Sequence, residues 1–249
     1  QLIEKEQLTY YFQPILSAKD GEIIAYEALM HSQLATLKNP EMILRIAREE
    51  NKLEDVERIC IFKSTETFDQ LRKNKLIKED ALLFINSIAS VSLNDEDRER
   101  FHHYFSHIQS LIVVEVTEEE NMSEEALIRK KETKGFSGMF ALDDYGSGYN
   151  SEINLLNLNP KYIKIDLTIV RDIDKDFDKQ QLVSNIVEYA HQRDAYIIAE
   201  GIETKEELLK VLELGVDYLQ GYYLSYPQSN PQEVSDESIQ TIDNYWKKR

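Results

Sequence analysis

The sequence predicts an α/β barrel, and three observations carry that prediction. Apolar runs of strand length alternate with amphipathic helical stretches along nearly the whole chain. The length of 249 residues suits one domain of this kind. The first two strands form a hairpin, so one barrel strand must run against its neighbours. We therefore expect a modified (β/α)8 barrel of the TIM type with one antiparallel strand.

The hairpin comes first. TYYFQPIL (9–16) and EIIAYEAL (22–29) flank the turn signal AKDGE. Two amphipathic stretches at 40–50 and 53–73 then predict helices. The later strands are expected at 82–86, 110–116, 138–144, 162–166, 195–200 and 216–224. The later helices are expected at 94–108, 123–134, 177–193, 204–215 and 232–247, with caps at Asn94 and Thr204 and a helix start at Ser123. We expect one domain over 1–249, with a core at 10–227.

Composition narrows the class of protein. Hydrophobic residues make up 42% of the chain, which is typical of a globular protein. A net charge of −17 argues against a nucleic-acid polymer as partner, because phosphates would be repelled. The lone Cys60 allows no internal disulfide, which fits a reducing cytoplasm. No run approaches the ~18 apolar residues of a membrane span. The first residue is Gln, which is consistent with a piece of a longer protein.

Seven apolar runs place polar residues at or near their carboxyl ends: Glu27, Asn86, Glu115, Asp143 with Asp144, Lys164, Glu200 and Gln220. In an α/β barrel these ends meet on one face, where active sites lie. One such acid alone is more often a loop cap or a solvated rim residue, but the recurrence favours a shared site. Clustered carboxylates need a compensating cation, and oxygen ligands favour Mg²⁺ or Mn²⁺. Adjacent aspartates suit two ions, as in phosphoryl hydrolysis.

Two further patterns have competing readings. DDYGSGYN (143–150) follows the paired acids, so we expect a mobile active-site loop rather than a plain connection. His102, His103 and His107 have zinc-like spacing, but no cysteine or acid cluster adjoins them. We expect these histidines to line the partly exposed side of a helix.

Eight blocks, in order, resemble the signature of EAL domains, which are phosphodiesterases specific for the bacterial second messenger cyclic di-GMP. The blocks are YFQPIL, YEALM, FIN, EVTE, DDYGSGY, YIKID, AEGIET and LQGYYLSYP. The resemblance runs from about Tyr10 to Pro227. It implies metal-dependent hydrolysis of cyclic di-GMP to linear pGpG by a homodimer in the bacterial cytoplasm.

The resemblance also implies residue roles. One Mg²⁺ or Mn²⁺ ion would be held by Glu27, Asn86, Glu115 and Asp143, and a second by Asp143, Asp144 and Glu200. Lys164 would orient the attacking water, with Gln220 in the same hydrogen-bond network, so we count Lys164, Glu200, Gln220 and Glu27 as catalytic. Substrate contacts would come from Gln13, His31 and Asp166. The loop and its anchors would involve Glu118, Glu203, Gly146 and Gly148, although Glu118 begins a charge run of a kind that is usually solvated.

Two departures from the family pattern leave alternatives open. His31 stands where these domains usually carry an arginine, and Glu152 stands where they usually carry a leucine. Histidine is shorter and mostly neutral at pH 7, so it would hold a phosphate less well. The first hypothesis is an active phosphodiesterase, because every inferred metal ligand is present. The alternatives are a receptor that binds cyclic di-GMP without cutting it and a protein-interaction module.

Overall fold

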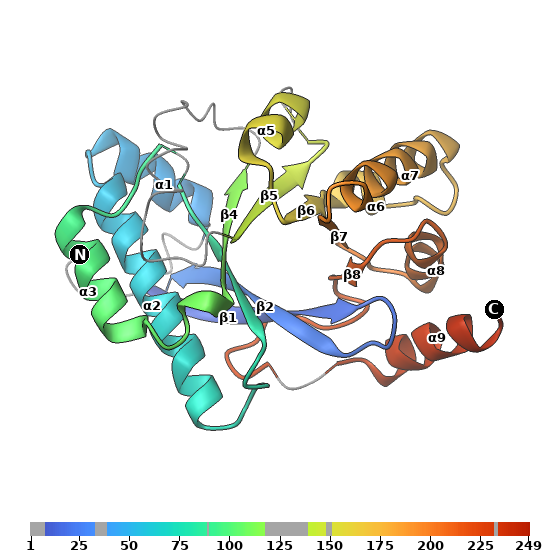
Figure 1. Cartoon of the computed structure of the whole chain (residues 1–249), viewed down its shortest axis with the longest axis horizontal. Helices are drawn as coiled ribbons and strands as arrows, with labels where there is room; N and C mark the ends of the chain where they lie inside the picture. Colours follow the sequence, from blue (N-terminus) through green and yellow to red (C-terminus); the bar gives the residue numbers. More distant parts are fainter. Residues whose placement is uncertain (1–7, 33–38, 89, 118–138, 148–150, 232–233) are drawn as a thin grey trace.

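The computed structural model describes residues 8–32, 39–88, 90–117, 139–147, 151–231 and 234–249. Eight strands form a closed barrel in sequence order, and the helices lie outside the ring of strands (Figure 1). The predicted fold class is confirmed. The predicted helix at 123–134 lies outside the described residues.

The strands match the apolar runs closely at the start of the barrel. They are β1 Leu8–Ser17, β2 Ile23–Ser32, β3 Leu82–Asn86, β4 Ile112–Thr117, β5 Met139–Tyr145, β6 Tyr162–Ile165, β7 Tyr196–Ala199 and β8 Tyr218–Leu219. The described helices are α1 Pro40–Glu49, α2 Leu53–Lys73, α3 Asp95–Phe105, the 3-10 turn η1 Gln109–Leu111, α5 Ser151–Leu158, α6 Leu167–Val170, α7 Phe177–His191, α8 Lys205–Glu213 and α9 Asp236–Lys247.

The antiparallel strand is β1. It pairs antiparallel with β2 on one side and with β8 on the other, whereas the remaining neighbours pair in parallel. The predicted hairpin is confirmed, with its turn between Ser17 and Ile23. Helix α9 covers this turn, because the indole nitrogen of Trp246 donates to the carbonyl oxygen of Ala18 at 2.8 Å (Figure 1). The last helix therefore packs against the turn that joins β1 to β2.

Helix caps follow the sequence signals. The Asn94 side chain accepts from the backbone N–H of Asp97, and Thr204 forms a capping box with Glu207. The final helix begins at Asp236 with Ser235 as its cap, four residues later than predicted.

The strand predicted at 216–224 is wrong after Leu219. The chain turns instead, because the N–H groups of Leu224 and Ser225 both donate to the carbonyl oxygen of Gly221 at 3.0 Å. A β-carbon on Gly221 would lie 2.2 Å from the backbone of Ile202, so only glycine fits at this turn. The chain therefore leaves the sheet after the short β8, at the mouth of the barrel.

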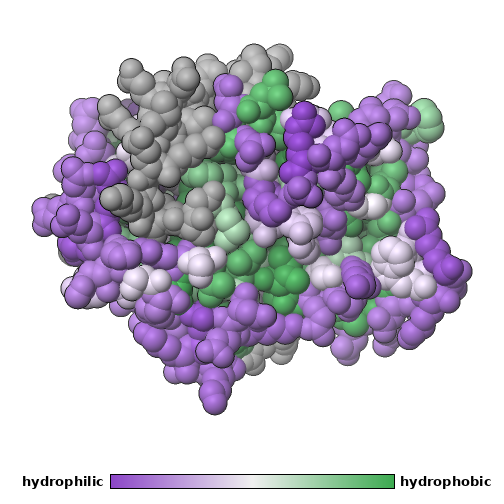
Figure 2. Space-filling model, viewed as in Figure 1, coloured by the Kyte–Doolittle hydropathy of each residue, from purple (hydrophilic) through white to green (hydrophobic). Residues whose placement is uncertain are grey.

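Surface polarity agrees with a barrel covered by amphipathic helices. Hydrophilic residues cover most of the helical rim of the face in Figure 2, and hydrophobic residues gather toward its middle. None of the described helices combines the length and apolarity that a bilayer crossing demands.

Candidate active site

The interior of the barrel is built in two layers. A buried apolar layer is formed by Ile15, Ala25, Phe84, Val113, Ala141, Tyr162 and Ile198. From β2 to β7, a candidate site residue follows two positions later, on the strand or directly after its end, and residues two apart share one face of a strand. The pairs, apolar residue first, are Ala25 and Glu27, Phe84 and Asn86, Val113 and Glu115, Ala141 and Asp143, Tyr162 and Lys164, and Ile198 and Glu200. The apolar layer is thus the floor of the site.

Lys164 is the centre of the polar layer. Its Nζ lies 2.5 Å from Glu115 Oε1, 2.8 Å from Asp143 Oδ1 and 2.8 Å from Glu200 Oε1. Glu27 Oε2 lies 3.4 Å from the same nitrogen. The lysine is only 1% exposed, so one buried ammonium offsets four carboxylates from four different strand ends. Negative charge remains in excess.

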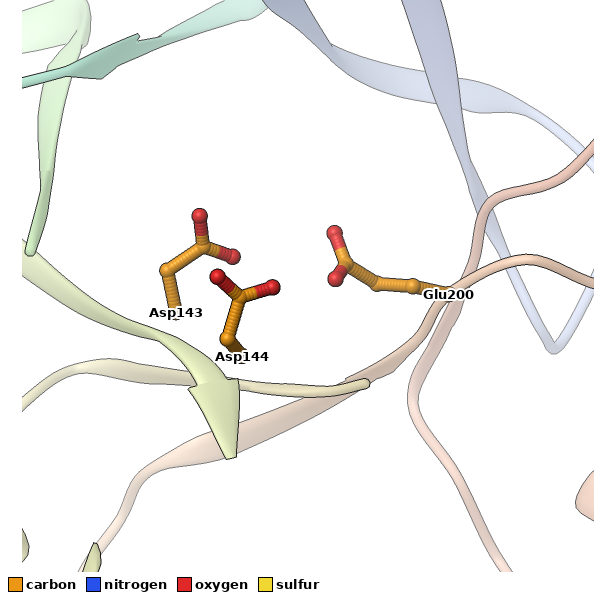
Figure 3. A group of neighbouring side chains, drawn as sticks. All are labelled: Asp143, Asp144 and Glu200. Carbon is orange, nitrogen blue, oxygen red and sulfur yellow. The ribbon is translucent and has the colours of Figure 1, made fainter. Parts of the chain in front are cut away.

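Asp143 and Asp144 both turn toward Glu200 (Figure 3). In a regular strand consecutive side chains point to opposite faces. Here the pairing of β5 with β6 shifts register between Leu142 and Tyr145, and Asp144 has a positive φ of 57°. The bulge brings carboxylate oxygens of all three acids within 4.8 Å of one another. Aspartate is one of the few residues other than glycine that adopt this left-handed backbone at small cost.

An amide network surrounds Glu27. Its Oε1 accepts from Asn86 Nδ2 at 3.1 Å, and its Oε2 accepts from Gln220 Nε2 at 2.7 Å. Gln220 also donates to Gln13 Oε1 at 3.3 Å, and Gln13 donates to the carbonyl oxygen of Ser225 at 3.1 Å. These bonds tie β1, β2 and β3 to the turn after β8.

Burial and the close packing of like charges shift the pKa values of the clustered side chains. Burial, with the adjacent charge of Asp143, raises the pKa of Asp144 to about 7. Burial also raises the pKa of Glu115 and of Glu200 well above the usual range, and Lys164 offsets only part of that rise. Burial by itself lowers the pKa of Lys164, but Asp143 and the other carboxylates hold it well above its usual value. The lysine therefore stays an ammonium at neutral pH.

The donor set fits divalent metal ions. Glu115 Oε2 and Gln220 Oε1 are buried and accept no hydrogen bond from the described residues. Buried acceptors without donors are rare, and a cation would satisfy them. The carboxylate and amide oxygens gathered here are hard ligands that suit Mg²⁺ or Mn²⁺.

The other predicted site residues have different surroundings. His31 is exposed near the end of β2, and its ring stacks on Tyr11 with centroids 4.5 Å apart. Asp166 Oδ1 accepts from the backbone N–H of Thr168 at 2.9 Å and so caps α6. Glu203 pairs with Arg171 at the surface. Glu118 and Gly148 lie outside the described residues.

Gly146 directly follows β5, as the predicted loop requires. It has a φ of 99°, and a β-carbon there would lie 2.0 Å from Ile169 Cδ1. Glycine adopts this φ without strain, so it sets how the chain leaves the paired aspartates.

Sequence reasoning missed Glu57, which is 2% exposed on α2. Its carboxylate accepts from the N–H of Ile88 at 2.9 Å and from the hydroxyl of Ser87. These bonds hold the segment directly after Asn86. The sequence does contain a signal for Glu57: it is an acidic residue at a position on the apolar face of the helix predicted at 53–73.

The remaining patterns of the sequence have structural roles. His102 lies on α3 as predicted, and its Nδ1 is 3.1 Å from Gln109 Oε1. The predicted helix position of His107 is wrong, because α3 ends at Phe105; its Nε2 lies 3.1 Å from the carboxylate of the buried Asp69. Among the described residues, the only cluster of three or more groups suited to a metal is Asp143, Asp144 and Glu200. Cys60 packs against the core, and burial raises its thiol pKa to about 12.

Comparison with known proteins gives a consistent picture. A family model for the EAL domain matches residues 1–227. The chain is 34% identical over 119 residues to the cyclic di-GMP phosphodiesterase PdeF of Escherichia coli (strain K12), a match covering 47% of this chain and 16% of that protein. It is 27% identical over 241 residues to the bifunctional diguanylate cyclase/cyclic di-GMP phosphodiesterase MucR of Pseudomonas aeruginosa, covering 91% of this chain and 34% of that protein.

Solved structures agree on the fold. The structure described as PaMucR phosphodiesterase, c-di-GMP complex, has a TM-score of 0.78 and 24% identity, and the match covers 92% of this chain and 94% of that one. The curated relatives are much longer, since the chain spans 16% of PdeF and 34% of MucR.

Proposed function

The chain belongs to the EAL domain family, and from that premise we propose that its barrel mouth hydrolyses cyclic di-GMP to linear pGpG with two Mg²⁺ or Mn²⁺ ions. The observation that carries the proposal is the cluster of Glu27, Glu115, Asp143 and Glu200 around the buried Lys164. The curated relatives PdeF and MucR are named for action on the same compound.

The reaction adds one water across one phosphodiester. The water oxygen bonds to phosphorus, the P–O3′ bond breaks, and the departing 3′ oxygen takes a proton. Glu27, Asn86, Glu115 and Asp143 would hold one ion, and Asp143, Asp144 and Glu200 the other. The ions, when bound, would polarise the phosphate and lower the pKa of the attacking water.

Lys164 contributes a fixed positive charge. Because the surrounding carboxylates keep it protonated, it can donate hydrogen bonds but cannot accept a proton. An ammonium that is already oriented and shielded from solvent stabilises negative charge as it develops on the phosphoryl oxygens. Gln13, Gln220 and Asn86 hold Glu27 in place through the amide network described above.

Incubation with cyclic di-GMP and either Mn²⁺ or Mg²⁺, with chromatographic detection of pGpG, tests the proposal. We expect metal-dependent product that disappears with EDTA. Absence of product at micromolar protein, together with clear binding of cyclic di-GMP by calorimetry, would overturn hydrolysis and leave a receptor. Absence of both would leave a protein-interaction module.

Replacing His31 with arginine should tighten binding of cyclic di-GMP. His31 is exposed near the end of β2, two strand residues past Leu29 on the face that also carries Glu27. A guanidinium there adds a charge-assisted contact to phosphate worth ~1.5–3 kcal/mol, about ten- to a hundredfold in Kd. Calorimetry on the two proteins measures it, and equal affinities would show that position 31 does not face the ligand.

A homodimer is also proposed from family membership. Apolar side chains that stand exposed on neighbouring segments support it: Leu156 on α5, Leu167 on α6 and Phe177 on α7. Exposed apolar groups of this size are typical of interaction surfaces. Light scattering of the purified chain tests the stoichiometry.

A further inference from the structure

A buried carboxylate on α2 supports the end of β3 from outside the barrel. Glu57 is 2% exposed and lies in the second turn of the helix. Its Oε2 accepts from the backbone N–H of Ile88 at 2.9 Å, and its Oε1 accepts from the hydroxyl of Ser87. Burial of a carboxylate is costly, and these two bonds offset part of that cost.

The strand pairing does not fix the chain beyond Asn86. Pairing of β3 with β2 ends one residue before Asn86, and pairing with β4 ends at Asn86 itself, opposite Glu115. The backbone N–H of Ser87 then donates to the carbonyl oxygen of Glu115 at 3.1 Å. The next N–H group, that of Ile88, donates to Glu57. The carboxylate on α2 therefore holds the chain where the sheet no longer does.

Packing leaves this segment uncovered on one side. A cavity of about 360 Å³ lies between α1, α2, the later part of β2 and the end of β3, and Asn86, Ser87 and Ile88 all line it. The Asn86 side chain is exposed, and its Nδ2 donates to Glu27 Oε1 at 3.1 Å. Protein interiors are usually filled, and here they are not. The bonds to Glu57 therefore supply support that packing does not.

We propose that Glu57 is a positioning residue of the metal site: by holding Ser87 and Ile88 it fixes the amide of Asn86, and so sets the affinity for the ion that Asn86 binds. The inference rests on the proposed function, which makes Asn86 a metal ligand. An amide oxygen carries no net charge, so its contribution depends on its being in place before the ion arrives. Outer residues that orient a ligand typically account for about ten- to a hundredfold in metal affinity.

Calorimetric titration of the chain with Mn²⁺, without substrate, tests the proposal. Glu57→Met removes both acceptors at similar side-chain length, and we expect the Kd of one Mn²⁺ site to rise about ten- to a hundredfold. Glu57→Gln still accepts from Ile88 and donates to the Ser87 hydroxyl, which turns to accept, so its Kd should stay within about threefold. Ser87→Ala removes one bond only and should give an intermediate rise. It also keeps the test open if the methionine variant does not fold.

A double-mutant cycle separates positioning from a general effect on the fold. Asn86→Ala should weaken the same Mn²⁺ site directly. If Glu57 acts through Asn86, Glu57→Met should add less than about twofold in that background, whereas independent effects would multiply.

Asp69→Asn is the matched control. Asp69 is another buried acid of α2, 4% exposed, and lies about 18 Å further along the helix axis than Glu57. It pairs with Lys73 and His107, away from the barrel mouth. The variant should lower the melting temperature, because it breaks a buried ion pair, and leave the Kd for Mn²⁺ unchanged.

An unchanged Kd for Mn²⁺ in both Glu57→Met and Ser87→Ala would overturn the positioning role and leave the proposed hydrolysis intact. Effects of the Glu57 and Asn86 variants that multiply would do the same. A wild-type chain that binds no Mn²⁺ would overturn both proposals, so the two failures are distinguishable.

Discussion

Replacing Lys164 with methionine should lower the melting temperature of the metal-free protein by about 6–20 °C. In the part of the chain that the structure describes, the buried ammonium is the one positive charge paired with Glu27, Glu115, Asp143 and Glu200. Removing one partner of a buried ion pair costs ~3–5 kcal/mol, because the remaining charges stay buried without compensation. In a chain of this size each kcal/mol shifts the melting temperature by about 2–4 °C. Thermal unfolding in EDTA measures the loss.

Manganese should rescue this variant more than it stabilises the wild type. A divalent ion replaces the missing positive charge. Binding of Mn²⁺ should therefore raise the melting temperature of the variant more than that of the wild type, whose lysine already offsets part of the negative charge. Lys175→Met serves as control, since Lys175 is exposed and pairs with Asp172 at the surface. It should leave the melting temperature unchanged with and without metal. A Lys164 variant as stable as the wild type in EDTA would show that the carboxylates do not depend on the lysine.

Much of this site could be predicted because the spacing of apolar and polar residues along the sequence shows where strands lie and which side chains share a face. Six site residues follow a buried apolar residue by two positions, as in Tyr162 and Lys164 or Val113 and Glu115. Once the fold class is a barrel, the carboxyl ends of the strands must converge. The same reasoning does not place Glu27, because β2 continues five residues further, to Ser32, and Glu27 is not at its end. Only the pairing of β2 with β3, which ends at Ala28, places Glu27 at the mouth.

Other features depend on tertiary structure that no local pattern contains. Alternation alone would send Asp144 away from Asp143, and the bulge that reverses it appears only in the pairing of β5 with β6. The residues after Leu219 carry strand propensity, but the contact of Gly221 with Ile202 turns the chain out of the sheet. Glu57 reaches the loop after β3 from a helix, a contact between segments about thirty residues apart.

Replacing Glu27 with glutamine should abolish hydrolysis without destabilising the metal-free fold. Glu27 is buried and lies beside the cluster's lysine, within an amide network that fixes its carboxylate. If it holds a metal ion, loss of its charge removes several kcal/mol of transition-state stabilisation, at least about a thousandfold in rate. Chromatographic assay of pGpG with saturating Mn²⁺ measures the effect.

The stability of the Glu27→Gln variant shows whether Glu27 acts as a metal ligand or is needed for the fold itself. In the metal-free protein the carboxylates outnumber the one ammonium, so removing a negative charge relieves repulsion. Gln220 can rotate its amide to offer Oε1, which has no donor among the described residues, to the new NH₂ group. We therefore expect a melting temperature in EDTA no more than a few degrees below that of the wild type. Glu22→Gln, at the exposed end of the hairpin beside Lys78, is the control and should keep full activity. A Glu27 variant that loses activity only because it unfolds would contradict the assignment, and one that retains the wild-type rate would remove Glu27 from the metal site.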